Sequence, residues 1–319
     1  MRIAIFGVGA MGSVYAGMLA EAGNEVVAVD PWAEHTAVIN ADGLRVEGAS
    51  GDRRVRGIRA SVDARIAMNC DLYVIATKAA AVGKAACVVA PLLHGGATVL
   101  AIQNGLGVGE SAAAHLPDGS LLLGVAGGFG AEMRAPGHVF HAAMKSIWLG
   151  ELGGGLTPRL EAIAAAWSLA GFHAEAYSDI KQLIWEKYIC NVAFSAPCTV
   201  FDCTLGEVLA DIGKWRVAAG CAREAFAIAH ALGIELSFTD PLAHVTEFAE
   251  QMPNARPSML LDHHAGRRSE IDAINGMAVK LGRKTGVATP FNEEVSTIVR
   301  ERESRFADSL SGVPTPGIS

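Results

Sequence analysis

A glycine-rich turn near the start of the chain is the feature that most constrains the fold. An apolar run leads into GVGAMG at 7–12, and a helix-forming segment and a second apolar run follow, ending at Asp30. In such a strand–turn–helix–strand unit Gly7 makes the tight turn, Gly9 lets the backbone approach a pyrophosphate, and Gly12 allows close helix packing. The unpaired N–H groups and the dipole at the helix N-terminus would hold the phosphates. We therefore expect a bound dinucleotide, contacted by Gly7, Val8, Gly9, Ala10, Met11, Gly12 and Asp30.

Length and charge narrow the class of protein. A chain of 319 residues is long enough for about two domains, each with its own core. The net charge of −7 and the isoelectric point near 5.8 argue against a nucleic-acid or anionic-membrane surface, because such surfaces are basic. We expect a soluble globular protein whose partners are small molecules.

The cysteines and the apolar stretches point to the cytoplasm. Six cysteines are scattered without a CxxC pair, so neither a metal site nor a disulfide framework is expected. The most apolar region, 85–102, is interrupted by Pro91 and by two glycines, which indicates a helix, a turn and a buried strand instead of a membrane span. A strand pattern begins at Met1, so we expect no signal peptide before it.

Strand and helix patterns alternate through the first half of the chain. Buried-strand patterns at 71–78 and 98–105 flank an alanine-rich helix, and further strands are expected up to residue 177. This alternation predicts an α/β Rossmann-type domain over 1–177, a doubly wound parallel sheet with helices on both faces. Lys78 and Asn104 follow strands, where such sheets bind ligands, so we expect both beside the cofactor.

Helical patterns replace strands after residue 178. We expect an all-α domain over 178–310 and a disordered tail over 311–319. Ser269 and Asp272 precede an apolar run in the spacing of a helix capping box. The predicted helices cover 180–196, 205–232, 240–252, 256–265 and 269–286.

The helical half holds polar residues that suit carbonyl reduction. Lys187 and Asn191 lie four apart, on one helix face. A positioned ammonium can protonate the oxygen on which charge develops, although a lysine beside an apolar stripe more often extends to solvent. By themselves, Ser258 and Glu270 fit helix caps, and Asp262 fits a solvated surface charge.

Taken in order, these motifs resemble the ketopantoate reductase (2-dehydropantoate 2-reductase) family over nearly the whole chain. The resemblance implies an NAD(P)-binding Rossmann domain followed by a helical domain that carries substrate and catalytic residues. It also implies that Lys187 is the general acid, that Glu270 engages it, and that Asn104 lies by the nicotinamide and substrate. The matching segments are 7–12, Thr77-Lys78, Gln103-Asn104-Gly105, Lys187 with Asn191, Pro257 to Leu260 with Asp262, Ala265 to Arg267, and Glu270 to Gly276.

The same resemblance assigns the remaining site residues. Asn191 and Ser258 resemble groups that orient the substrate, and Asp262 matches an acid near them. Lys78 resembles a lysine that faces the cofactor or the substrate.

Departures from the family pattern bear on the cofactor. Asp30 stands where NADPH-using members carry a basic residue for the 2′-phosphate. A carboxylate accepts hydrogen bonds from both ribose hydroxyls and repels a phosphate, so we expect NAD(H), with NADP(H), the family default, as the alternative.

Other departures bear on the substrate. Ser195, Leu205, Ala255 and Leu261 replace amide side chains that many members carry, which would weaken recognition of a hydroxylated substrate. Two functions are therefore open. The protein either reduces ketopantoate or is an NAD-dependent D-2-hydroxy-acid dehydrogenase that acts on another branched 2-oxo acid. A third possibility is an NAD(H)-sensing protein without catalysis. The long apolar helices favour a homodimer.

Overall fold

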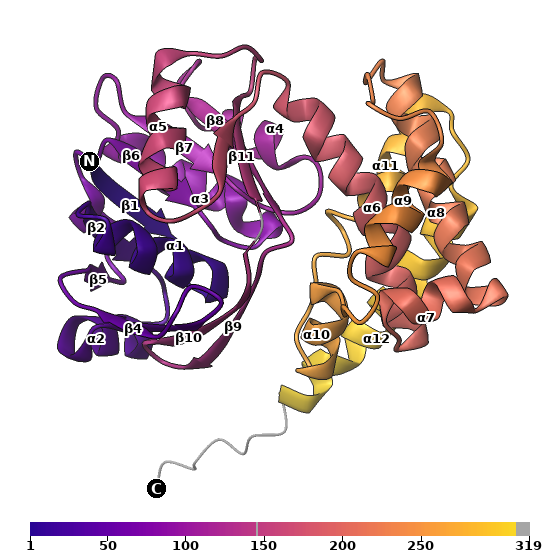
Figure 1. Cartoon of the computed structure of the whole chain (residues 1–319), viewed down its shortest axis with the longest axis horizontal. Helices are drawn as coiled ribbons and strands as arrows, with labels where there is room; N and C mark the ends of the chain where they lie inside the picture. The colour runs from indigo at the N-terminus through magenta and orange to yellow at the C-terminus, as the bar shows by residue number, and fades with distance from the viewer. Residues whose placement is uncertain (145, 311–319) are drawn as a thin grey trace, which may run out of the picture. The chain divides into compact units, whose positions relative to one another are not determined.

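The computed structural model describes residues 1–144 and 146–310, with side chains up to residue 306. The chain divides into two compact units, shown in Figure 1 in indigo to magenta and in orange to yellow. The amino-terminal unit comprises residues 1–103 and 107–183, and the helical unit comprises 104–106 and the chain from residue 184 onward.

An eight-stranded sheet is the centre of the amino-terminal unit. Its neighbouring strands are parallel except for the pair β8 and β11. The strand β6 is buried along its whole length, as expected for a strand covered on both faces. In sheet order the strands are β12 (Ala174–Ala176), β11 (Ser146–Glu151), β8 (Leu121–Gly127), β7 (Thr98–Ala101), β6 (Leu72–Ile75), β1 (Arg2–Phe6), β2 (Glu25–Val29) and β5 (Arg59–Ser61).

Two crossover helices give the sheet its doubly wound character. Helix α1 (Ala10–Glu21) connects β1 to β2, and helix α3 (Val82–Val89) connects β6 to β7. These crossovers run in opposite directions along the sheet, and because crossovers are right-handed, the two helices cover opposite faces. The direction reverses between β1 and β6, which is where doubly wound sheets bind ligands. The predicted fold class is confirmed.

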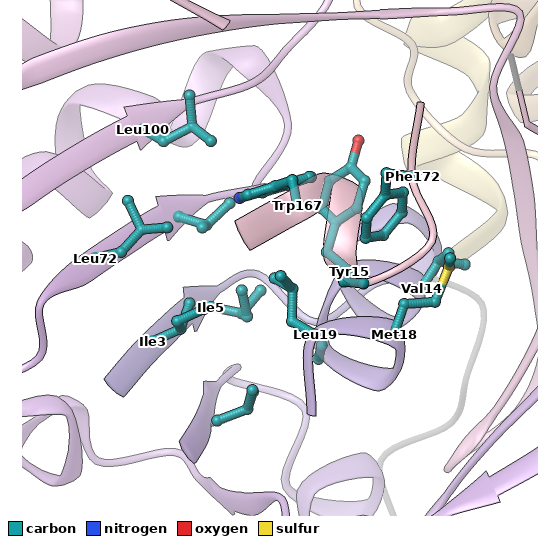
Figure 2. Close-up of a cluster of buried hydrophobic side chains, with 14 of the residues drawn as sticks. Ile3, Ile5, Val14, Tyr15, Met18, Leu19, Leu72, Leu100, Trp167 and Phe172 are labelled. Carbon is teal, nitrogen blue, oxygen red and sulfur yellow. The ribbon is translucent and has the colours of Figure 1, made fainter. Parts of the chain in front are cut away.

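Aromatic packing joins α1 to helix α5 (Pro158–Leu169). The buried ring of Tyr15 lies 5.0 Å from Trp167 and 5.8 Å from Phe172, measured between ring centroids. Figure 2 shows these three rings beside Leu19 of the same helix and Ile3 and Ile5 of β1. The glycine turn therefore leads into a helix that is fixed to the sheet by a dense core.

The prediction of one parallel sheet is wrong in two places. Strands β4 (Arg53–Val55), β3 (Leu44–Gly48), β10 (His138–Ala143) and β9 (Gly130–Ala135) form a second sheet. Between β8 and β11 the chain makes the antiparallel pair β9–β10 in place of a crossover helix, so β11 returns antiparallel to β8. Two helices, α2 (Ala33–Asp42) and α4 (Val108–Ala113), and three short 3₁₀ segments, Ala64–Ala67, Ala79–Ala81 and Ala90–Leu92, complete the unit.

The helical unit is built around α6 and α8. Ile189 and Val192 of α6 belong to a buried cluster that also contains Ala222 of α8. Within the described residues, no helix is long and apolar enough to cross a membrane. The helices are α6 (Ile180–Phe201), α7 (Leu205–Ala210), α8 (Ile212–Ala231), α9 (Pro241–Glu250), α10 (Ser258–His264), α11 (Asn275–Thr285) and α12 (Pro290–Leu310).

The predicted helices differ from the structure in three places. The predicted helix 205–232 is two helices, because the Asp211 carboxylate accepts the N–H groups of Gly213 and Lys214 and starts α8 there. Ser269 does not cap a helix; its hydroxyl donates to Glu303, and α11 begins six residues later. Helix α12 was not predicted. The tail 311–319 lies outside the described residues.

Candidate active site

Lys187 lies on α6, and its ammonium makes a defined contact within the helical unit. The Nζ atom donates a hydrogen bond of 2.7 Å to Oδ1 of Asn104. The next residue, Tyr188, donates from its hydroxyl to the carbonyl of Ile274 at 2.8 Å. This part of α6 is therefore tied both to the segment that carries Asn104 and to the turn that follows Glu270.

Segment 104–106 is held against that same turn. Gly105 has φ of +88°, and a Cβ at this position would lie 2.4 Å from the carbonyl oxygen of Ala273. The next N–H, that of Leu106, donates to the same oxygen at 3.1 Å. Only glycine fits this close approach of two backbones, which explains the turn signal after the predicted strand.

Glu270 acts on Lys187 electrostatically. Burial lowers the pKa of Lys187 to about 8, and the negative charge of Glu270 opposes this shift by raising it. Part of the lysine residue stays accessible, although its ammonium has the environment of a buried group. An ammonium whose pKa lies close to physiological pH can donate its proton readily at that pH.

The other predicted substrate residues occupy distinct places in the helical unit. Asn191 is half-buried, one helical turn beyond Lys187. Ser258 is exposed at the first position of α10, whose start has no side-chain cap, so its interpretation as a helix cap is wrong. Asp262 is buried and forms an ion pair of 3.0 Å with Arg267, so it is not a solvated surface charge.

The glycine turn of the amino-terminal unit fits a pyrophosphate. A side chain at Gly7 would collide with the backbone of Thr77, and one at Gly12 would lie 1.9 Å from a turn carbonyl. A Cβ at Gly9 would meet nothing within 4 Å, so no packing within the chain requires glycine there. Gly9 is also the residue before α1, and it provides no side-chain cap. The open space at a helix N-terminus is what an approaching phosphate needs.

Asp30 holds the turn to the end of β2. Its carboxylate accepts the Val8 N–H at 2.7 Å through Oδ2 and the Trp32 N–H at 2.9 Å through Oδ1. Carboxylate oxygens have further lone pairs, so acceptor capacity remains for ribose hydroxyls.

The other residues predicted to contact the cofactor lie after β6 and at the start of α1. Lys78 is exposed and lies just after β6, at the start of a 3₁₀ turn. Ala10 and Met11 begin α1.

Two buried polar atoms near the strand ends belong to residues to which the sequence analysis assigned no role in the site. Oγ1 of Thr77 and Oε1 of Gln103 lack a hydrogen-bond partner among the described residues. Gln103 is anchored by its amide nitrogen, which donates to the Ile75 carbonyl at 2.5 Å. Such atoms are costly to bury, and a bound polar group would satisfy them. The sequence feature that could have identified Thr77 and Gln103 is their position directly before Lys78 and Asn104.

The described part of the chain contains no group of three or more histidine, cysteine or acidic side chains arranged to hold a metal ion. The six cysteines are free thiols, and five of them are buried.

Comparison with known protein families covers most of the chain. The family described as Ketopantoate reductase PanE/ApbA matches residues 3–154, and its C-terminal part matches residues 179–303. The 2-dehydropantoate 2-reductase of Mesorhizobium japonicum is 31% identical over 319 aligned positions, covering 94% of this chain and 97% of the relative. The 2-dehydropantoate 2-reductase of Halobacterium salinarum is 28% identical, covering 94% and 98%.

Solved structures agree with these relatives. A PanE/ApbA family ketopantoate reductase from Ralstonia eutropha JMP134 has a TM-score of 0.87 and 32% identity, covering 96% of this chain and 100% of that one. D-mandelate dehydrogenase in a ternary structure with NADH and anilino(oxo)acetate has a TM-score of 0.88 and 28% identity, covering 96% and 99%. The matches span both units, and the chain belongs to the ketopantoate reductase PanE/ApbA family of NAD(P)-dependent oxidoreductases.

Proposed function

We propose that this protein reduces the C2 carbonyl of a branched 2-oxo acid with NADH, and that ketopantoate is the first substrate to test. The observation that carries the proposal is the 2.7 Å hydrogen bond from Lys187 to Asn104, with Glu270 in electrostatic contact. A proton donor, an amide and a carboxylate are brought together by segments far apart in the sequence. A protein that only sensed NAD(H) would have no use for such a donor.

Lys187 supplies the proton in this proposal. A nicotinamide cofactor held at the glycine turn would supply the hydride, and the reduction would leave negative charge on the carbonyl oxygen of the substrate. The Lys187 ammonium stabilises that charge and protonates the oxygen, and Asn104 directs one of its N–H bonds. Glu270 keeps the lysine protonated by raising its pKa against the effect of burial. Asn191, Ser258 and Asp262 are the candidates for orienting the substrate.

Asp30 supports NADH over NADPH. Its carboxylate is held at the end of β2 by two backbone N–H groups, so it cannot turn away easily from an added 2′-phosphate. Charge repulsion between the Asp30 carboxylate and the 2′-phosphate would then disfavour NADPH. The preference is measured as the ratio of kcat/KM values for the two cofactors, and a ratio that favours NADPH would overturn this part of the proposal.

A second function, oxidation of a D-2-hydroxy acid other than pantoate, is favoured by a specific observation. Leu205 is buried in the helical core and Ser195 is also buried, so two positions that could carry amide groups here do not. The likeness to D-mandelate dehydrogenase, at 28% identity, supports the same reading.

One panel experiment separates these functions. The fall in NADH absorbance is followed with ketopantoate, 3-methyl-2-oxobutanoate and phenylglyoxylate at equal concentrations. The highest kcat/KM for ketopantoate would support the first function, and the highest for either other acid would support the second. NADH binding without turnover of any acid would overturn both and favour a sensor.

We also propose a cytoplasmic homodimer. All six cysteines are free thiols, which suits a reducing compartment. In the helical unit, Ile212 is 90% exposed and Leu261 is 50% exposed, and apolar side chains of this kind are often covered by a partner. Sedimentation equilibrium of the purified protein tests the dimer.

A further inference from the structure

Trp32 presents an aromatic ring beside the proposed cofactor-binding turn. It stands two residues after Asp30 and keeps 38% of its surface exposed, which is unusual for tryptophan. Its backbone N–H donates to the Asp30 carboxylate at 2.9 Å. Its ring is stacked on that of His35, with centroids 5.0 Å apart and planes 14° from parallel. The ring is therefore fixed in position while part of it faces solvent.

His35 is a buried support for that ring. It has no exposed surface, and its Nδ1 accepts the Gly137 N–H at 2.8 Å. In the neutral ring the proton then lies on Nε2, which is 3.4 Å from Oγ of Ser13. Burial lowers the pKa of His35, which favours this neutral form. The support is uncharged, and both of its ring nitrogens have partners.

Hydrogen bonds connect both residues of the stacked pair to the glycine turn. The Ser13 hydroxyl donates to the Val8 carbonyl at 2.8 Å. The N–H of Val8 donates to Asp30, which also accepts the Trp32 N–H. The glycine turn, the acid proposed to bind the ribose and the aromatic pair are thus connected by hydrogen bonds.

We propose that Trp32 is the stacking platform for the adenine ring of the cofactor, and that His35 is the residue that positions it. This inference rests on the proposed use of a nicotinamide dinucleotide. If Asp30 binds the ribose hydroxyls, the adenine attached to that ribose lies one sugar away, within reach of the ring fixed two residues further along. Any base can stack on an aromatic face, and removing such a ring typically weakens binding about five- to a hundredfold.

The experiment measures ligand binding by calorimetry. The ligands are NADH, ADP-ribose, which keeps the adenosine end, and reduced nicotinamide mononucleotide, which lacks it. We expect Trp32→Ala to weaken NADH and ADP-ribose about tenfold or more and to leave the mononucleotide unchanged. Trp32→Phe keeps an aromatic face and should retain most of the affinity. Leu169→Ala, which removes a side chain 84% exposed in the same unit, is the control.

His35→Ala tests the positioning role. It should weaken ADP-ribose and leave the mononucleotide unchanged, whereas general damage to the unit would weaken both ligands equally. Equal ADP-ribose affinity in Trp32→Ala and the wild type would overturn the inference, as would equal weakening of both ligands.

The proposed function fails separately. NADH binding that depends on Trp32, without turnover of any 2-oxo acid, would support the platform and overturn the reductase. No binding of NADH or ADP-ribose to the wild type would overturn both.

Discussion

At the scale of single residues, Lys187 is the side chain on which the proposed chemistry depends. Most lysines keep their ammonium in water, and burying one is costly unless a partner compensates. Here the cost is visible as a pKa lowered to about 8, partly compensated by Glu270 and by the hydrogen bond to Asn104. A lysine in this state is protonated at neutral pH and can still release its proton.

Replacing Lys187 by alanine should lower kcat for 2-oxo acid reduction by about 10²- to 10⁴-fold, the usual contribution of a positioned general acid. NADH affinity should change little, because the glycine turn is untouched. Steady-state kinetics and calorimetry measure the two quantities. Lys181→Ala, at an exposed lysine of the same helix, is the matched control. A loss of less than about tenfold would contradict the assignment of Lys187 as the acid.

Glu270→Gln should move the pH dependence of reduction in a defined direction. Reduction needs protonated Lys187, so its rate should fall as the pH rises through the lysine pKa of about 8. Glu270 raises that pKa, so neutralising it should lower the pKa and move the alkaline limb to lower pH. The pH profile of kcat/KM for both proteins decides the point. A limb that stays in place or moves to higher pH would show that Glu270 does not act through Lys187.

At the scale of helices and strands, local patterns predicted most elements, whereas contacts between distant segments decided where some of the helices begin. The order β1, α1, β2 follows directly from the apolar runs around Gly7. Helix α12 was missed although it carries local signals, Pro290 at its first position and apolar residues at helical spacing after it. Its start is further stabilised by Glu224 of α8, which accepts the N–H groups of Phe291 and Asn292. Ser269 likewise donates to Glu303 of α12 and caps no helix.

Glu224→Ala should lower the free energy of unfolding by about 2–4 kcal/mol, because it leaves buried N–H groups without an acceptor. The side-chain amide of Asn292 would lose the same partner, which binds it at 2.7 Å. Denaturant titration measures the change. Glu301→Ala, at an exposed glutamate of α12, should change stability by less than about 0.5 kcal/mol. Equal effects of the two substitutions would show that Glu224 does not stabilise the start of α12.

At the scale of the whole molecule, sequence patterns indicated more about the fold than about the site. The glycine turn and Asp30 predicted a dinucleotide-binding unit without further information. Lys187 became a strong candidate only through the family resemblance. A lysine beside an apolar helix face gives no local sign of which side chain will bind its ammonium. That partner, Asn104, is 83 residues away in the chain. The bond between them follows from tertiary structure, which no local pattern encodes.

Segment 104–106 shows how the two compact units share one chain. Its neighbours on both sides belong to the amino-terminal unit, whereas the segment itself belongs to the helical unit. Gly105 makes this possible, since its φ of +88° and its contact with Ala273 exclude a side chain. The segment therefore brings the Asn104 side chain within hydrogen-bond distance of the Lys187 ammonium. It also contacts the turn that follows Glu270.

Gly105→Ala should consequently impair turnover more than cofactor binding. The new Cβ would lie 2.4 Å from the Ala273 carbonyl oxygen, so the two backbones must move apart and carry Asn104 and Glu270 with them. Displacements of about 1 Å at a reacting centre can cost about 10²-fold in rate, so we expect kcat to fall at least tenfold while the Kd for NADH stays within about twofold. Gly95→Ala is the control, because a Cβ there meets nothing within 4 Å. Wild-type turnover in Gly105→Ala would mean that the segment does not position the catalytic groups. A parallel loss of NADH affinity would instead mean that the substitution also disturbs the amino-terminal unit.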